Sequence, residues 1–317
     1  MKAMRFHEFG DADVLRYEDV DLPVPGPGEV RIRVAATSFN SVDGNIRAGL
    51  MQGPIPVVLP HTPGLDVAGT IDALGDDVSD VSNVTVGDKV IGFLPMNANG
   101  ASAEFVVAPA DILAVAPSTI PLADAAALPL VGLTAWQAVF DHANVVAGQR
   151  VLISGAGGAV GGYTVQLAKA AGAHVIATAS PRSIARVRSA GADEIVDHTT
   201  ADVIAAVGQP VDVLFNFAPI EPEQFAEMVA LVRAGGVVVS TTVWMPAPAD
   251  EKRGVRAVDV FVRSDAAQLS ELVGRVDRGE LTVDVGERVP LAELGSVHAR
   301  AISGTLAGKV IVVPDAT

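Results

Sequence analysis

Cysteine is missing from this sequence of 317 residues, and its absence excludes several kinds of chemistry at once. Without a thiol the chain can form no disulfide, no cysteine-ligated zinc site, no iron–sulfur cluster and no thiol nucleophile. The sequence also has no run of Lys or Arg, and its 22 basic against 37 acidic residues give a net charge of -15. Nucleic acids and anionic membrane surfaces are therefore not expected as partners.

Long apolar runs are absent as well. No stretch approaches the roughly 18 apolar residues that a membrane-spanning helix needs, and the first residues, MKAMRFHEFG, lack the apolar core of a signal peptide. We therefore expect a cytoplasmic protein. Half of the residues are hydrophobic, so the chain can bury a large core. Because a domain typically has about 100–200 residues, we expect two domains.

The pattern of the chain changes near Pro121. Short strand-like segments separated by Gly, Pro and Asp come before it, such as EVRIRVAAT (29–37) and GDKVIGFL (87–94), and they predict a β-rich domain. After it, apolar strands alternate with helical segments, which predicts a doubly wound parallel sheet. The last residues are strand-like again. The expected fold is α/β, with a first domain of residues 1–121 completed by about 281–317 and a cofactor domain of residues 122–280.

A glycine-rich loop, GAGGAVGG (155–162), lies between an apolar strand and a helix. The free N–H groups and the positive end of a helix at such a turn bind a pyrophosphate. Gly157 and Gly158 have no Cβ and let the backbone approach the phosphates, and Gly161 or Gly162 would let the helix pack closely on the sheet. The loop therefore predicts a dinucleotide site.

The end of the next strand, ATASPRS, indicates which dinucleotide binds. NAD sites usually carry a carboxylate here for the ribose 2′-hydroxyl, and this segment has none. Ser180 can donate a hydrogen bond and Arg182 can pair with a 2′-phosphate, so NADPH is favoured over NADH. His198, at the end of the third strand, is either a residue of the adenosine pocket or a purely structural histidine.

With these features placed, the chain resembles the zinc-independent, zeta-crystallin-like quinone oxidoreductases of the medium-chain dehydrogenase/reductase superfamily. The resemblance runs almost end to end. It implies a GroES-like catalytic domain, a Rossmann cofactor domain, and commonly a homodimer. The motifs that carry it are SFNSVDGNIRAG (38–49), PGLDVAGTI (63–71), VGDKVIGF (86–93), LPLVGLTAWQAV (128–139), GAGGAVGGYTVQLAKAAGA (155–173) and GKVIVV (308–313).

The resemblance also implies roles for residues at matching positions. Asn40 and Asp43 match the family's N-x-x-D, which lines the substrate side, although Asn and Asp also cap turns whatever the function. The residues implied for the cofactor are Thr134 near the nicotinamide; Gly157, Gly158, Ala159 and Val160 at the pyrophosphate; Ser180 and Arg182 at the 2′-phosphate; Asn216, Phe217 and Ala218 at the ribose; and Thr241 and Thr242 near the nicotinamide.

The sequence departs from the wider superfamily in two respects. Zinc-dependent relatives need a Cys near position 40 and a GHE motif, whereas this chain has Leu65 in place of that histidine. No metal is expected. Many members also carry a Tyr just after the N-x-x-D aspartate, and here Gly44 and Asn45 follow it. The source of the proton is therefore left open.

The expected reaction is hydride transfer from NADPH to a quinone or to the β-carbon of an enone. Asn40 or a water would donate a hydrogen bond to the acceptor oxygen, and Asp43 would orient its loop. Two alternatives stay open: an enoyl-thioester or alkenal reductase of the same fold, and a non-catalytic NADPH-binding redox sensor. Met51 and Trp244 are each either walls of the substrate pocket or core residues.

Overall fold

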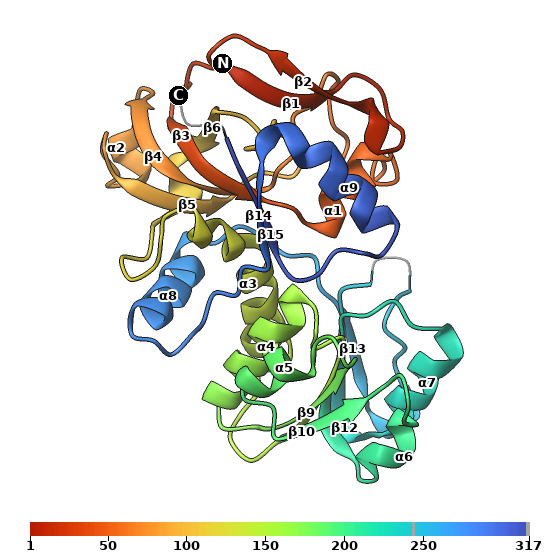
Figure 1. Cartoon of the computed structure of the whole chain (residues 1–317). Coiled ribbons are helices and arrows are strands. Elements are labelled where there is room, and N and C mark those ends of the chain that lie inside the picture. The colour runs from red at the N-terminus through yellow and green to blue at the C-terminus, as the bar shows by residue number, and fades with distance from the viewer. Residues whose placement is uncertain (243–244, 315–317) are drawn as a thin grey trace. The chain divides into compact units, whose positions relative to one another are not determined.

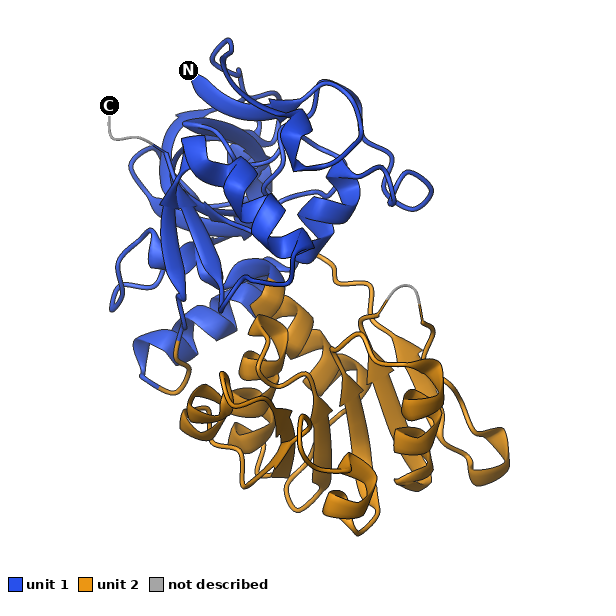
Figure 2. Cartoon of the chain, turned by 45° about the vertical axis from the view of Figure 1, so that its right-hand side comes forward, with its two compact units in different colours: residues 1–130, 264–279, 283–317 blue, residues 131–263, 280–282 orange. Residues whose placement is uncertain are grey.

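The computed structural model describes residues 1–242 and 245–314. The chain forms two compact units, the first made of residues 1–130, 264–279 and 283–317 and the second of residues 131–263 and 280–282 (Figure 2). Residues 122–130 and helix α8 (Ala266–Asp277) thus pack with the first unit, because α8 lies against strand β7 (Leu113–Val115). These bounds differ from the expected ranges. They reflect packing alone, and the functional division at residues 121 and 281 stays a prediction.

The first unit contains a seven-stranded sheet, in which β14, β15, β3, β4, β5 and β7 follow one another and β6 pairs with β3 (Figure 1). The C-terminal strand β15 runs antiparallel to β3, with Val312 opposite Thr37. Residues distant in sequence therefore meet at this pair of strands. The bounds are β3 (Glu29–Ser38), β4 (Asp66–Leu74), β5 (Lys89–Phe93), β6 (Phe105–Pro109), β14 (Glu287–Pro290) and β15 (Val310–Val313).

The alternating direction of side chains along the strands explains how one face of this sheet is buried. In β3, Val30, Ile32 and Val34 point into the core while the arginines between them stay accessible. Val67 and Val90 join the same core cluster. A hairpin of β1 (Lys2–Phe6) and β2 (Leu15–Asp19) and the helices α1 (Ser41–Arg47), α2 (Val78–Val81) and α9 (Leu294–Ile302) complete the unit.

The second unit is built on a six-stranded sheet whose order is β10-β9-β8-β11-β12-β13, with every pair parallel. This is the Rossmann strand order, so the expected fold is confirmed. The strands are continuous apolar runs because helices cover both faces. The bounds are β8 (Arg150–Ser154), β9 (His174–Ala179), β10 (Glu194–Asp197), β11 (Val211–Asn216), β12 (Val232–Ser240) and β13 (Arg256–Asp259), with α4 (Ala159–Ala170), α5 (Ile184–Ser189), α6 (Val203–Val207) and α7 (Pro222–Ala230).

The boundary between the units falls within α3 (Pro129–Trp136), which continues as a π-helical segment over Gln137–His142.

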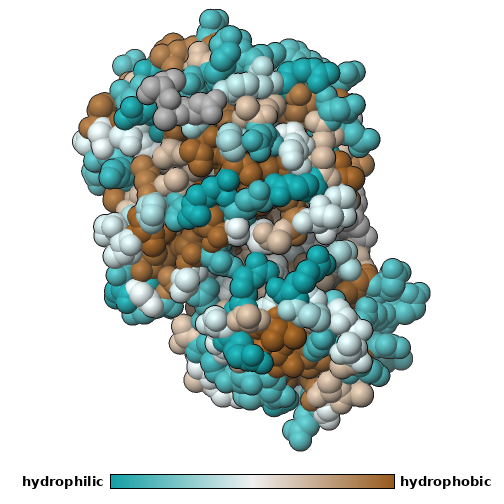
Figure 3. Space-filling model, viewed as in Figure 1, coloured by the Kyte–Doolittle hydropathy of each residue, from teal (hydrophilic) through white to brown (hydrophobic). Residues whose placement is uncertain are grey.

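The surface face in Figure 3 mixes hydrophilic side chains with apolar ones. The most exposed large apolar side chains, Val24 at 82% and Val58 at 83%, are far apart in sequence. Within the described residues, no helix is both long and apolar enough to cross a membrane.

Candidate functional site

The glycine loop connects β8 to α4 in the second unit, at the point where the strand order reverses between β8 and β11. Gly155 has φ +80°, which favours glycine. A Cβ on Gly157 would lie 2.5 Å from Ser183 Oγ, and one on Gly161 would lie 2.3 Å from Gly155 O. Gly161 is therefore the residue that lets the helix pack closely, since a Cβ on Gly162 would meet nothing within 4 Å.

Gly158 differs from these glycines. It precedes α4 in extended conformation, with φ -82° and ψ 171°, and an added Cβ would touch only Gly155 O, at 3.4 Å. The fold therefore leaves room for a Cβ at this position. No side chain caps α4 in the described part of the chain, so the N–H groups of Ala159 and Val160 open the helix as a phosphate site requires.

The connection from β9 to α5 packs directly on this loop. Ser183 Oγ accepts from Ser180 N at 3.1 Å, and Arg186 donates from Nη2 to Gly157 O at 3.0 Å. Arg182 is exposed in the same connection. Sequence reasoning missed Arg186, although residues 180–192 carry Arg182, Arg186 and Arg188 without any acidic residue. That local excess of positive charge was the available signal.

The ends of the other strands gather beside the loop. A Cβ on Gly155 would come within 3.0 Å of Ala218 N, and Phe217 N donates to Ser154 O at 3.0 Å. Asn216 is fully buried, with Ser154 and Ser240 opposite it on the neighbouring strands. Its Oδ1 accepts from Ala218 N, whereas its Nδ2 has no hydrogen-bond partner in the part of the chain that the structure describes. A buried donor of this kind normally has a partner.

The remaining implied cofactor residues take the following places. His198 is exposed, and its N–H donates to Ala179 O at 3.1 Å, which places it beside the end of β9. Thr241 N donates to Asn216 O, and Thr242 Oγ1 lies 2.7 Å from Ser240 Oγ. Thr134 is a buried residue of α3. Of the two suggested pocket walls, Met51 is buried and Trp244 lies outside the described residues.

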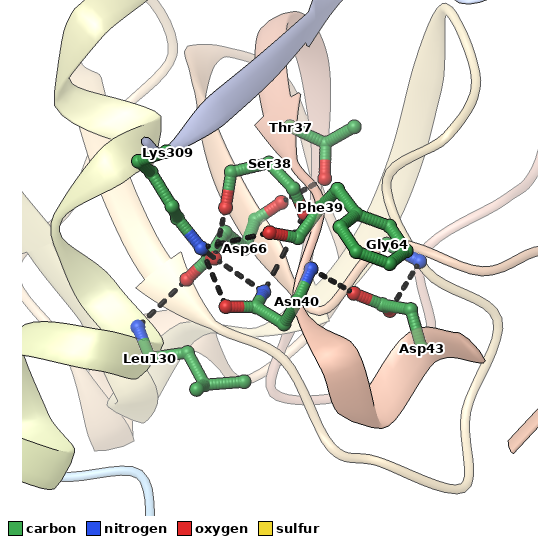
Figure 4. Close-up of polar contacts among 9 residues, drawn as sticks. All are labelled: Thr37, Ser38, Phe39, Asn40, Asp43, Gly64, Asp66, Leu130 and Lys309. Carbon is green, nitrogen blue, oxygen red and sulfur yellow. Dashed lines mark hydrogen bonds and ion pairs between the residues drawn. The ribbon is translucent and has the colours of Figure 1, made fainter. Parts of the chain in front are cut away.

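The first unit holds a second group of polar residues, which we call the Asp66 cluster: Ser38, Asn40, Asp66 and Lys309 (Figure 4). Asp66 is completely buried and accepts four hydrogen bonds. Its Oδ1 accepts from Leu130 N at 2.7 Å, near the start of α3. Its Oδ2 accepts from Asn40 Nδ2 at 2.8 Å, from Lys309 Nζ at 3.4 Å and from Ser38 Oγ.

Lys309 is buried as deeply as its partners. Its ammonium donates to Asp66, to Phe39 O at 3.1 Å and to Asn40 Oδ1. Burial lowers the pKa of Lys309, and the charges of Asp66 and Asp43 oppose that shift. Sequence reasoning missed both Asp66 and Lys309. The signal was a charged residue inside an otherwise apolar strand segment, in LDVAG and GKVIVV.

Asp43 supports the backbone rather than the Asp66 carboxylate. Its Oδ2 accepts from Asn40 N at 2.8 Å and its Oδ1 from Gly64 N at 3.1 Å. Burial raises the pKa of Asp43 to about 6. Both oxygens are engaged with N–H groups, so the side chain ties the start of α1 to the segment before β4. Among the described residues, no cluster of three or more His, Cys, Asp or Glu could hold a metal ion.

Comparisons with known proteins agree with this two-part architecture. The alcohol dehydrogenase GroES-like domain family matches residues 26–118, and the zinc-binding dehydrogenase family matches residues 190–312. A chloroplast envelope quinone oxidoreductase homolog of Arabidopsis thaliana is 33% identical, over 99% of this chain and 98% of its own length.

Two solved structures have the same fold over their whole length. The quinone oxidoreductase of Coxiella burnetii is 29% identical with a TM-score of 0.88, and the match covers 99% of each chain. A mycobacterial protein solved as a complex with NADPH is 28% identical with a TM-score of 0.84, covering 99% of this chain and 100% of that one.

Proposed function

Since the chain belongs to the quinone oxidoreductase family of the medium-chain dehydrogenase/reductase superfamily, we propose that it transfers a hydride from NADPH to a quinone or a related electron-poor carbonyl acceptor. The chain is an enzyme, an oxidoreductase whose fold binds a nicotinamide cofactor. What we propose is that the cofactor is NADPH and that the acceptor is a quinone or a related carbonyl compound.

The glycine loop supports the cofactor site. The fold leaves room for a Cβ at Gly158, so the absence of a side chain there supports a bound group that approaches the bare backbone. Within the described residues, the same edge of the sheet holds a buried donor without a partner, Asn216 Nδ2, which a ribose or phosphate oxygen would satisfy. The first turn of α4 adds free N–H groups. These donors fit an anionic dinucleotide, and the unsatisfied Asn216 amide is the observation that carries the assignment.

The preference for NADPH rests on charge at the end of β9. No carboxylate follows that strand to repel a 2′-phosphate, and Ser180 and Arg182 follow it instead. A guanidinium binds a phosphate through paired, charge-assisted hydrogen bonds. The whole chain has a net charge of -15, so the positive charge after β9 is a local feature.

The proposed mechanism uses position and electrostatics. When bound, the reduced nicotinamide supplies the hydride. The protein contributes alignment, which is worth roughly 7–11 kcal/mol for well-oriented reactants, and Asn40 donates a hydrogen bond to the acceptor oxygen as negative charge develops there. The oxygen then takes a proton from water, so that quinone, hydride and proton together give the hydroquinone.

The mechanism needs no zinc ion. Zinc-dependent relatives need a Cys near position 40 and a His at the position of Leu65, and this chain has neither. We expect dialysis against a strong chelator to leave turnover unchanged. A loss of activity that added Zn²⁺ restores would contradict this part of the proposal.

The proposal is tested by following NADPH oxidation with a panel of acceptors: a benzoquinone, a naphthoquinone, an enone and a crotonyl thioester. We expect turnover with the quinones or the enone. Turnover confined to the thioester would favour an enoyl-thioester reductase instead. Tight NADPH binding without turnover of any acceptor would favour a redox sensor.

We also propose that the chain forms a homodimer through the edge of the parallel sheet. In the described residues β13 pairs only with β12, so its other edge is open to another strand. Phe261, two residues beyond β13, is 61% exposed. An apolar ring beside an open strand edge is a contact that a second copy would bury.

A further inference from the structure

The carboxamide of Asn40 is held at both of its ends by opposite charges. Lys309 Nζ donates to Oδ1, and Nδ2 donates to Asp66 Oδ2 at 2.8 Å. Figure 4 shows the three side chains converging from the residue before α1, the start of β4 and the segment just before β15. The Asn40 side chain is nearly buried, with 6% of the residue exposed, so these contacts dominate its surroundings.

These two contacts decide which way the amide faces. An ammonium has only donors and therefore must face the oxygen of a carboxamide, whereas an ionised carboxylate has only acceptors and must face the nitrogen. The pairing of Lys309 with Asp66 thus leaves one orientation of Asn40 compatible with the cluster. Without the two charges, the long contact between Nδ2 and Ser38 O, at 3.5 Å, would favour this orientation only weakly.

One N–H of Asn40 is less engaged than the other. Beyond Asp66, its Nδ2 has one further acceptor among the described residues, Ser38 O at 3.5 Å, which is the outer limit of a hydrogen bond. The carbonyl end of the same amide accepts a hydrogen bond from an ammonium. Hydrogen bonds in such a chain polarise one another, so a cation at the oxygen makes the amide N–H a stronger donor.

We propose that Lys309 and Asp66 are positioning residues, which turn an N–H of Asn40 toward the acceptor oxygen and strengthen it as negative charge develops there. This inference rests on the proposed function, because it assigns the cluster to the substrate of that reaction. Lys309 thus supplies a fixed positive charge at the amide oxygen, Asp66 fixes the amide nitrogen, and both act through Asn40 without contacting the substrate.

A purely structural role would leave a different kinetic signature. The cluster joins β3, β4, the residue before β15 and the start of α3, so its loss would lower activity through disorder. Such a loss reduces turnover by a similar factor for every acceptor. A polarised donor instead matters most for acceptors that stabilise negative charge poorly.

The experiment therefore uses a series of quinones of one shape and increasing electron demand, with kcat and KM measured for each. Lys309→Met removes the cation but leaves Asp66 buried without its ion pair, so the variant risks misfolding. The double variant Lys309→Met/Asp66→Asn removes both buried charges, so neither is left unpaired. Its new amide must keep an oxygen toward Leu130 N–H, so its nitrogen faces Asn40 and reverses the Asn40 amide.

We expect kcat to fall in the double variant by about 10- to 100-fold for the least electron-poor quinone, below the 10²–10³ that loss of a whole oxyanion donor costs. The fall should shrink for the most electron-poor quinone, and KM for NADPH should stay unchanged. Thr37→Val is the matched control. It removes a buried hydrogen bond to the backbone oxygen of Asp66, at 2.6 Å, without touching the carboxylate or Asn40. In Thr37→Val, kcat should depend on the electron demand of the quinone as it does in the wild type.

Two outcomes would overturn the inference: the double variant keeping kcat within twofold of wild type, or losing the same factor with every quinone. Both are distinct from failure of the proposed function, in which the wild-type enzyme itself would turn over no quinone or enone.

Discussion

The guanidinium of Arg186 donates a hydrogen bond to the carbonyl oxygen of Gly157 at 3.0 Å, so helix α5 holds the glycine loop from outside. Arg182, four residues earlier and before the start of α5, is exposed and donates no such hydrogen bond to the loop within the described residues. The two arginines therefore have different expected effects on cofactor binding.

Arg182→Ala should weaken binding of NADPH and leave NADH nearly unchanged, because only NADPH has the 2′-phosphate. Loss of a hydrogen bond to a charged group costs about 1.5–3 kcal/mol, which corresponds to roughly 10- to 100-fold in Kd. The measurement is the Kd of each cofactor by fluorescence titration. Equal losses for NADPH and NADH would refute the assignment.

Arg186→Leu should weaken both cofactors by similar factors, because it removes a support of the loop that would bind the shared pyrophosphate. Arg188→Ala is the control, since it removes an exposed arginine from the same helix. A loss specific to NADPH in Arg186→Leu would instead make Arg186 a second ligand of the 2′-phosphate.

Gly158→Ala should fold normally, because its Cβ would meet only Gly155 O within the chain. It should lose cofactor binding if the pyrophosphate binds against this residue as proposed. Gly157→Ala should lower Tm, because its Cβ would lie 2.5 Å from Ser183 Oγ. Thermal unfolding and cofactor titration of both variants separate the two roles. Wild-type affinity in folded Gly158→Ala would mean that the phosphates bind elsewhere.

Stability should fall as pH falls from 6.5 toward 4. Burial lowers the pKa of His298 to about 3, with Arg47 adding to the shift, and lowers that of His61 to about 4. Both stay neutral in the folded chain but take up a proton near pH 6.5 when unfolded, so the unfolded state gains stability below that pH. Protonation of each histidine in the unfolded state should lower the free energy of unfolding by about 2 kcal/mol between pH 6.5 and 5.

Asp43 acts in the opposite direction. Its pKa is raised to about 6, so its contribution to stability is present below about pH 4 and is lost as pH rises through 6. As pH falls from 7 to 5, the stability lost through the two histidines exceeds the stability gained through this single carboxyl. Urea unfolding at pH 7 and pH 5 should show the net loss, and His298→Gln should reduce it by about 2 kcal/mol. An unchanged pH dependence in that variant would mean that His298 is protonated in the folded chain.

Lys309→Met should lower the free energy of unfolding by about 3–5 kcal/mol, the usual cost of breaking a buried ion pair. The double variant with Asp66→Asn should recover much of this loss, because no buried charge is left unpaired. Urea unfolding of both variants measures the difference. If the double variant were no more stable than Lys309→Met, the pairing of these two charges would not be what stabilises the cluster.

Phe261→Asp should shift the protein from dimer to monomer, because a charge beside the open edge of β13 opposes strand pairing between copies. Analytical ultracentrifugation of the variant and of the wild type measures the change. A monomeric wild type would contradict the proposed dimer, and a dimeric variant would place the interface elsewhere.

The sequence by itself determined the parallel sheet, the β-rich unit and the glycine loop, because these depend on local periodicity and on glycines at one strand-to-helix turn. It also made Arg182 the predicted partner of a 2′-phosphate, because the absence of a carboxylate after this strand can be read directly from the sequence. The role of Asn40 and Asp43 as turn residues was likewise visible in their spacing.

Only the tertiary structure decided which residues surround Asn40. Asp66 and Lys309 are 243 positions apart, and they meet because β15 pairs with β3 beside β4. The same holds for Arg186 and Gly157, which are 29 positions apart. No local pattern encodes such contacts, because they arise when strands choose their neighbours and the core closes around the charges that they carry.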